Sequence, residues 1–233
     1  MKHPNLLDRD HIENREKDLE QALQTMIRDV EFPCVGAKSA LARGNLKVVG
    51  AHRLDSNWDD LILHRELLEW ARRYRADRQG LRSLALIFEG PDDLSESRFE
   101  QLMWERIQSM ADKDAWLGQP YDHRVSSDPS DPHFSLSFGG EAFFVVGLHP
   151  NSSRPARRSQ HPTLVFNLHD QFERLREEGR YQRMREAILE RDKKLAGDIN
   201  PMLAAHGEAS EARQYSGRAV DSDWACPFHD PRA

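Results

Sequence analysis

The most constraining feature of this sequence is a stretch of alternating apolar and polar residues that ends in two glycines. Residues 134–138 alternate in this way, Gly139 and Gly140 follow, and an apolar segment returns over residues 142–148. Alternation with a period of two predicts a strand with one buried face, and paired glycines supply the positive φ angles of a tight turn. We therefore predict an antiparallel hairpin over this region.

Other segments predict further strands and helices around the hairpin. The run at residues 84–88 is wholly apolar, as in a central strand buried on both faces, and strands are also predicted at residues 47–54 and 163–168. Residues 118–132 contain prolines and aspartates without periodicity and predict a long loop. Helices are predicted at residues 14–30, directly after Cys34, at 58–76 with Asn57 as cap, after the capping-box pattern of Ser97 and Glu100, at 171–178 and at 181–196.

Together these elements predict the α+β class, as a single domain with a mostly antiparallel sheet flanked by helices. No internal repeat and no shift of composition marks a second domain. We therefore expect a flexible N-terminal tail at residues 1–12 and one domain over residues 13–233.

Composition and missing motifs exclude several classes of function. Hydrophobic residues make up 38% of the 233-residue chain and charged residues 31%, and the net charge of -6 gives no attraction to nucleic acid or anionic membranes. No run of 18 apolar residues is present and the N-terminus lacks an apolar signal core, so we expect a cytoplasmic protein. No HExxH, CxxC, P-loop or dinucleotide motif occurs, which leaves zinc and nucleotide cofactors unsupported.

The two cysteines lie in near mirror-image settings, as Phe-Pro-Cys at Cys34 and Cys-Pro-Phe at Cys226. Cys34 precedes a predicted helix, whose N-terminal amides and dipole favour the thiolate, the form that binds a metal. A rigid thiolate beside apolar surface suits a heme-thiolate iron site. The alternatives are two buried thiols that pack as small apolar groups, or a disulfide, which is uncommon in the cytosol.

Residues 149–158 form a second informative segment between two predicted strands. It places Arg154, Arg157 and Arg158 on a loop that two prolines stiffen. Guanidinium groups match carboxylates and phosphates in bidentate fashion, so this loop suits the propionates of a heme or an anionic substrate. The alternative is an exposed basic loop that binds no ligand.

Histidines and glutamates supply further candidates. His149 and His169 end successive predicted strands, so we expect both to point into one pocket as iron ligand, proton relay or buried core histidine. Glu89 and Glu105 offer carboxylates to a cationic substrate, although most helix-surface glutamates are merely solvated.

Residues 202–217 form a polar and irregular stretch near the C-terminal end of the chain. Within it, Arg213 is a further candidate partner for a propionate. Alternatively, it pairs with Glu208 or Glu211.

Five segments, taken together and in order, resemble the YqcI/YcgG family: residues 32–37, 149–158, 162–169, 211–217 and 224–228. The likeness extends from about Phe32 to Phe228. That family includes heme-dependent N-oxygenases that act on free arginine or related guanidino amino acids. The resemblance implies heme b (iron protoporphyrin IX) and hydroxylation of a guanidine nitrogen by O2.

Carried onto this sequence, the resemblance makes Cys34 the proximal iron ligand, with Cys226 and His149 as rivals. For such an enzyme we expect catalytic roles for His149 and Asn167, and we expect Glu89 or Glu105 to hold the cationic substrate. Six residues are then expected to contact the heme besides Cys34: Lys38, Asn151, Arg154, Arg157, Arg158 and Arg213.

The partners that follow are a guanidino amino acid, O2 and an external electron donor (a reductase or ferredoxin) or peroxide. We expect no nucleic acid or membrane partner, and a homodimer is compatible with a compact enzyme of this size. Two other functions stay open: a heme protein for sensing or carriage without turnover, and a heme-free module that binds an anionic metabolite.

Overall fold

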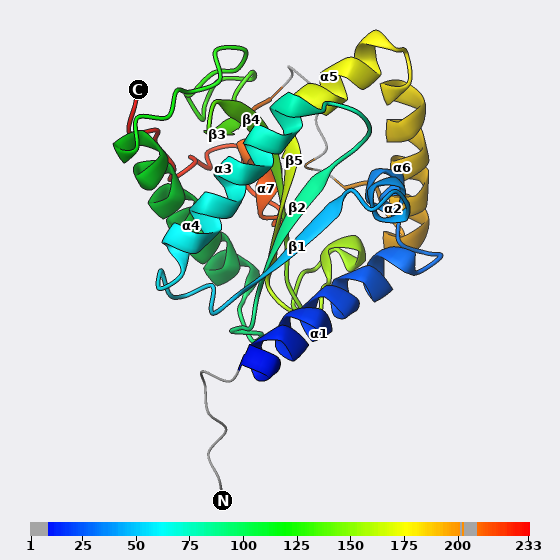
Figure 1. Cartoon of the computed structure of the whole chain (residues 1–233). Helices are drawn as coiled ribbons and strands as arrows, with labels where there is room; N and C mark the ends of the chain where they lie inside the picture. The colour runs from blue at the N-terminus through cyan, green and yellow to red at the C-terminus, as the bar shows by residue number, and fades with distance from the viewer. Residues whose placement is uncertain (1–8, 201, 203–208) are drawn as a thin grey trace, which may run out of the picture.

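The computed structural model describes residues 9–200, 202 and 209–233 and contains one five-stranded sheet (Figure 1). The strand order is β1-β2-β5-β4-β3, in which β1 and β2 run parallel and the other three neighbouring pairs run antiparallel. The strands are β1 (Leu46–Ala51), β2 (Ser83–Phe88), β3 (Leu136–Phe138), β4 (Glu141–Leu148) and β5 (Thr163–Leu168). The predicted α+β class with a mostly antiparallel sheet is confirmed, and so is the Gly139-Gly140 hairpin.

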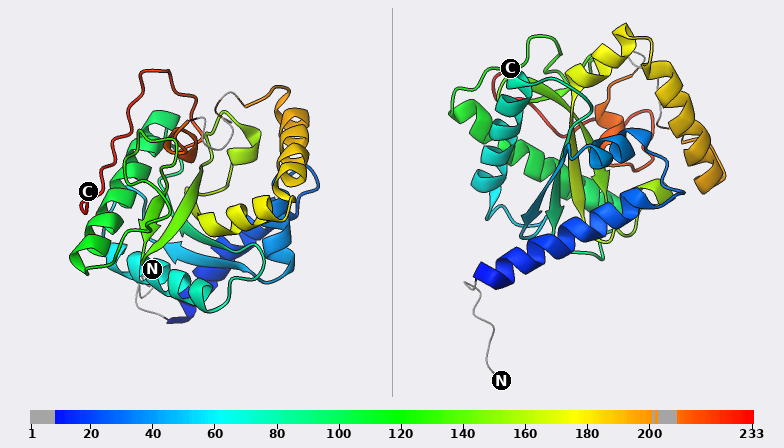
Figure 2. Two further views of the ribbon diagram at one scale, coloured as in Figure 1. Left: turned by 90° about the horizontal axis from the view of Figure 1, so that it is seen from above. Right: turned by 45° about the vertical axis from the view of Figure 1, so that its right-hand side comes forward.

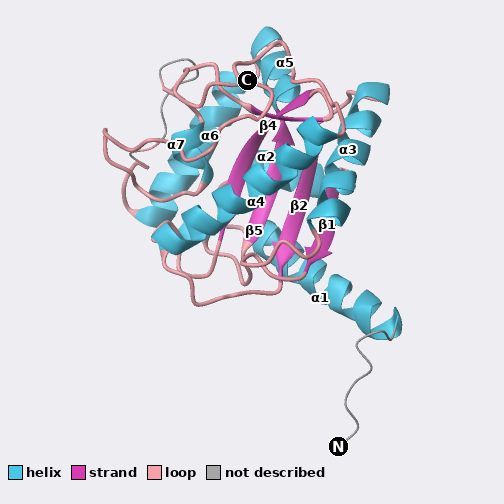
Figure 3. Cartoon of the chain, turned by 90° about the vertical axis from the view of Figure 1, so that its left-hand side faces the viewer, coloured by secondary structure: helices cyan, strands magenta, loops and turns pink. Residues whose placement is uncertain are grey.

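Helices cover both faces of this sheet. In Figure 1, α3 and α4 lie to the left of the strands, whereas α1, α2 and α6 lie to the right, and Figure 2 shows the same two layers from other directions. α1 continues past one end of the strands (Figure 3). The helices are α1 (Arg9–Arg28), α2 (Val35–Ala42), α3 (Asp60–Ala76), α4 (Glu96–Trp116), α5 (His169–Glu177), α6 (Tyr181–Ala196) and α7 (Ala212–Tyr215), with a 3₁₀ helix η1 (Pro155–Arg157).

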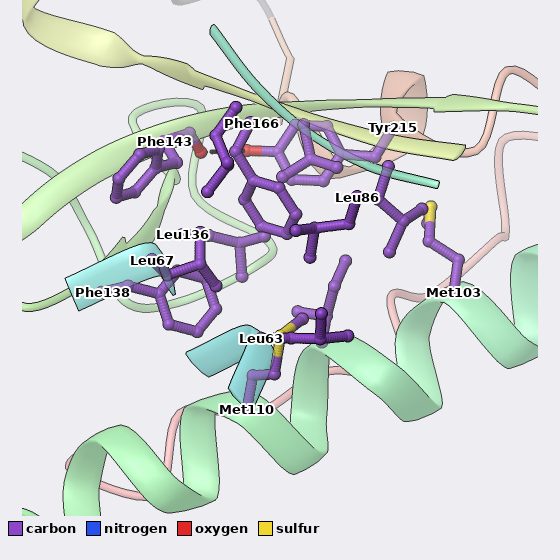
Figure 4. Packing of buried hydrophobic residues seen from close by; sticks show 14 of the residues in the cluster. Leu63, Leu67, Leu86, Met103, Met110, Leu136, Phe138, Phe143, Phe166 and Tyr215 are labelled. Atoms are coloured by element: carbon purple, nitrogen blue, oxygen red, sulfur yellow. Dashed lines mark hydrogen bonds between the residues drawn. The ribbon is translucent and has the colours of Figure 1, made fainter. Parts of the chain in front are cut away.

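The apolar run of β2 divides its side chains between the two layers. Leu84, Leu86 and Phe88 pack into the larger core beneath α3 and α4, while Ala85 and Ile87 pack with the apolar stripe of α1. Because successive strand residues point to opposite faces, only a strand buried on both sides can be apolar throughout. Figure 4 shows the larger core, in which aromatic rings of β3, β4 and β5 meet leucines of α3 and methionines of α4.

Two predicted helix starts are wrong in detail. Ser95 caps α4 by accepting a hydrogen bond from the Arg98 amide at 3.3 Å, whereas the predicted partner Glu100 binds Arg218 instead. α3 begins after Asp59, not Asn57, and the Asp59 carboxylate binds Arg106 and the His52 amide rather than an amide of the helix. Long-range ion pairs thus hold Glu100 and Asp59, so that neither side chain caps its helix.

α1 begins at Arg9, so the predicted tail is partly helical. Residues 1–8 of that tail lie outside the described residues. None of the helices that the structure describes has the length and apolar character needed to cross a membrane.

The edge of β4 is completed by side chains at and beyond the end of the short strand β3. Arg157 donates to the Gly147 carbonyl at 3.0 Å, and the Tyr215 hydroxyl donates to the Phe143 carbonyl at 3.3 Å. Glycine at position 147 lets the backbone of Tyr215 lie close to β4, because a Cβ there would be 2.9 Å from the Tyr215 carbonyl oxygen. Arg157 and α7 are thereby fixed beside the sheet.

Candidate functional site

A cavity of about 320 Å³ lies between the sheet and the helices α2, α5 and α6. Its volume falls in the range of small-molecule and cofactor sites. The sheet contributes Ser83, Phe144, Val146, Val165 and Asn167, which are the positions of β2, β4 and β5 that point away from α3 and α4. α6 contributes Tyr181, Met184, Arg185, Ile188, Leu189 and Asp192.

Cys34 lines this cavity at the start of α2. Its extended backbone makes it the N-cap residue, and its Sγ accepts a hydrogen bond from the Ala37 amide at 3.4 Å. Burial raises the pKa of the thiol, while the amides of Ala37 and Gly36 and the charge of Arg157 act in the opposite direction. The expected effect of the helix terminus is therefore present, but desolvation outweighs it. A bound cation would reverse this balance in favour of the thiolate.

Arg157 is the cation whose charge lowers the pKa of that thiol. Its guanidinium donates to the carbonyls of Gly147, Gln214 and Tyr215 at 3.0–3.3 Å. Burial lowers its pKa to about 10, although the charges of Asp192 and Cys34 raise it. Among the described residues no carboxylate is bonded directly to it, so the cavity wall carries a positive charge that an anionic ligand would neutralise.

The other predicted heme-binding side chains have protein partners. Arg154 lines the cavity but is ion-paired with Asp192 and Asp198. The remaining four do not line it. Arg158 donates to the Ser152 carbonyl, Arg213 to the carbonyls of Asp221, Ser222 and Trp224, Lys38 to those of Asp29 and Val30, and Asn151 to that of Leu94.

The expectation that His149 and His169 share one pocket is wrong. β4 and β5 are antiparallel, with Leu148 opposite Thr163 and Phe143 opposite Leu168, so the two histidines lie at opposite ends of the strand pair. His149 is buried and stacks on Phe99 at 4.4 Å, and burial lowers its pKa. It does not line the cavity, and so its predicted roles as iron ligand and catalytic residue find no support in its position.

The carboxylates predicted for substrate binding are also outside the cavity. Glu89 is ion-paired with Arg15 of α1. Glu105 is exposed on α4, where it accepts a hydrogen bond from Gln101 at 2.8 Å. Within the part of the chain that the structure describes, the acidic residues that do line the cavity are Asp192 and Glu211.

Cys226 lies on the other side of the sheet from Cys34. It packs against the larger core with Trp224, and burial raises its pKa to about 12. Both cysteines are free thiols. The disulfide alternative is therefore absent, and only Cys34 lies on the cavity wall.

The sequence patterns did not predict several of the residues that line the cavity. The stripe of α6 repeats at positions 181, 184, 185, 188, 189 and 192, a pattern that marks one helix face. Arg185 belongs to this stripe, and none of the described residues forms an ion pair or hydrogen bond with its guanidinium. Asn167, predicted as catalytic, does line the cavity, and its Oδ1 accepts from the Ser83 hydroxyl at 2.6 Å.

Glu211 occupies another part of the cavity wall. Its Oε2 accepts from the hydroxyls of Ser135 at 3.1 Å and Tyr215 at 3.5 Å, and its Oε1 lies 3.8 Å from Nδ1 of His169. Burial raises the pKa of this carboxyl to about 7. A buried carboxyl that titrates near neutral pH beside a histidine can take up and release protons.

The profile of the YqcI/YcgG family matches residues 23–229 of this chain. The chain belongs to the YqcI/YcgG family. Every residue that lines the cavity falls within the matched region. Searches of curated proteins and of solved structures find no match to the chain.

Proposed function

We propose that this member of the YqcI/YcgG family is a heme-dependent monooxygenase that N-hydroxylates a guanidine nitrogen of free L-arginine or a related guanidino compound. The observation that carries the proposal is the position of the Cys34 thiol, on the wall of an apolar cavity and under the influence of Arg157. The resemblance to heme-dependent N-oxygenases of the same family supplies the chemistry.

The residues present fit a heme with thiolate ligation. Apolar side chains from the sheet, α2 and α6 form most of the walls, and Cys34 presents one sulfur donor among them. Arg157, which the sequence predicted, and Arg185, which it did not, would offer positive charge to the two propionates, whereas Arg158 and Arg213 lie outside the cavity. When bound through a thiolate, heme supplies reductive activation of O2 and transfer of one oxygen atom.

The protein itself would contribute position, charge and exclusion of water. The amides at the start of α2 and the Arg157 guanidinium stabilise negative charge on Cys34. Among the described residues of the cavity wall, Asp192 offers a carboxylate to a cationic substrate, whereas Glu89 and Glu105 lie outside the cavity. Electrons come from a separate reductase or ferredoxin, or the oxidant is peroxide.

The test is reconstitution of the full chain with heme, followed by incubation with L-arginine, a reductant and O2. We expect a Soret band with the carbon monoxide signature of thiolate ligation, and a product heavier than arginine by one oxygen atom. A chain that shows no Soret band after reconstitution would not be a heme enzyme.

A second candidate function is a heme-free module that binds an anionic metabolite. The half-buried Arg157, whose direct partners are carbonyl groups, and Arg185 favour an anion in the cavity whichever ligand carries it. If the chain binds no heme, calorimetric titration with small carboxylates would test this alternative. The Arg185→Met substitution should weaken the binding of these carboxylates.

A further inference from the structure

A connected series of polar groups leads from the protein surface to the cavity wall beside Glu211. At the outer end, the Glu173 side chain on α5 is 39% exposed, and its Oε1 lies 3.0 Å from Nε2 of His169. His169 is nearly enclosed, and its Nδ1 lies 3.3 Å from the hydroxyl oxygen of Ser135. Ser135 in turn donates to Oε2 of Glu211 at 3.1 Å, and Glu211 lines the cavity.

Each member of this series can exchange a proton with the next. An imidazole can accept a proton on one ring nitrogen while releasing one from the other, which suits a group with polar partners on both sides. A hydroxyl can pass a proton between His169 and Glu211, and the direct separation of 3.8 Å between Nδ1 and Oε1 leaves only a small movement to close. No step in the series exceeds that distance.

The surroundings of Glu211 tune its carboxyl for proton transfer near neutral pH. Burial raises its pKa to about 7 and the charge of Glu173 acts in the same direction. The bonds from Ser135 and Tyr215 and the charge of Arg176 act in the opposite direction. His169, whose Nδ1 lies 3.8 Å from Oε1, is a further titratable neighbour among the described residues.

We propose that Glu173, His169, Ser135 and Glu211 form a proton path from the surface to the cavity. The proposal rests on the proposed function, in which protons are consumed. One turnover combines R–NH2 with O2, two electrons from the external donor and two protons, and yields R–NHOH and H2O. One oxygen atom forms the N–O bond, and the other leaves as water with the two protons.

The same balance supplies a discriminating control. With hydrogen peroxide as oxidant, R–NH2 and H2O2 yield R–NHOH and H2O, and no proton is taken from solution. Loss of the path should therefore slow turnover with O2 and reductant, but leave turnover with peroxide nearly unchanged. A defect in substrate binding or folding would slow both reactions alike.

The first experiment uses the full chain without heme and measures the infrared band of protonated carboxyl groups against pH. We expect a band that titrates near pH 7, disappears in Glu211→Gln and shifts in His169→Gln. Glu105→Gln, which changes an exposed carboxylate outside the cavity, serves as the matched control and should leave the band unchanged. A titration unaffected by Glu211→Gln would overturn the proposal.

The second experiment uses the heme-loaded chain with both oxidants. We expect Glu211→Gln to lower the O2-driven rate by about a hundredfold, within the usual range for proton-transfer groups. The wild-type rate should decline above pH 7, where Glu211 loses its proton, and this decline should be absent in the variant. Glu211→Asp should restore part of the rate, and peroxide-driven turnover should change by less than about threefold.

The outcomes separate this proposal from the function on which it rests. Equal losses with O2 and with peroxide would make Glu211 a binding or structural residue and overturn the path alone. A wild-type chain that transfers oxygen with neither oxidant would overturn the proposed function, and the need for the path with it.

Discussion

The two faces of the sheet carry similar residues but differ in how closely the side chains on them pack. Under α3 and α4, the side chains pack into one large apolar core, in which Leu67, Phe138 and Phe166 are fully buried (Figure 4). Under α2, α5 and α6, the side chains stop short of one another and leave the cavity. Cys226 packs on the first face and Cys34 lines the second, although their sequence settings are nearly identical.

This contrast shows where stability and function separate. Buried charges on the packed face are paired within the protein, as Arg106 is with Asp59 and Asp60. The cavity face holds groups whose charged forms burial disfavours, including Arg157 and Glu211. The packed face therefore supports the fold, while the cavity face retains unfavourable groups that a ligand or a proton can relieve.

The largest expected effect is on the packed face. Arg106→Met should lower the free energy of unfolding by about 3–5 kcal/mol, because it removes the counter-ion of buried Asp59 and leaves buried Asp60 with Lys113 alone. Urea denaturation measures this. The matched change Arg185→Met on the cavity face should shift the free energy by no more than about 0.5 kcal/mol. Similar losses in both variants would contradict the division between the faces.

Truncation of apolar residues should follow the same division. Leu67→Ala removes a fully buried side chain of α3 and should cost about 2–5 kcal/mol of unfolding free energy. Ile188→Ala on α6 removes atoms that already border a cavity, so we expect a loss of about 1 kcal/mol or less. Thermal and urea unfolding of both variants would show whether the cavity persists in solution.

Glu211 should make stability depend on pH in a defined direction. Its pKa is about 7 in the folded protein and 4.5 ordinarily, so the folded state binds the proton more tightly. The contribution of Glu211 to the free energy of unfolding is therefore complete below pH 4.5 and falls by about 3 kcal/mol as pH rises to 7. Glu211→Gln should remove this decline, measured as unfolding free energy between pH 4.5 and 7.5. A variant with the wild-type slope would show that another group is responsible.

The two cysteines give the smallest expected change in stability and the most direct comparison. Each Cys→Ala variant should lose about 1 kcal/mol of unfolding free energy. Heme titration should nevertheless separate them, because Cys34→Ala removes the thiolate spectrum and lowers heme affinity at least tenfold, or about 1.4 kcal/mol. Cys226→Ala should bind heme normally. The reverse result would move the iron site to the packed face.

Local patterns predicted most of the fold but only part of the candidate site. The alternation before Gly139 and the apolar run of β2 correctly predicted strands, because period and burial are encoded over a few residues. Four of the predicted site residues, Cys34, Arg154, Arg157 and Asn167, lie on the wall of one cavity, and their roles there stay predictions. Glu89, Glu105 and His149 were not, because exposure and strand direction depend on partners distant in the chain.

The sequence by itself determined the strands and helices, the hairpin and the family, since each depends on local periodicity or on an ordered set of motifs. Only the tertiary structure decided which thiol lines a cavity and which is packed in the core. It also decided that His149 and His169 lie apart and that Glu211 lies beside His169. The physical reason is that local sequence specifies which side chains share a face, whereas long-range packing specifies what covers that face.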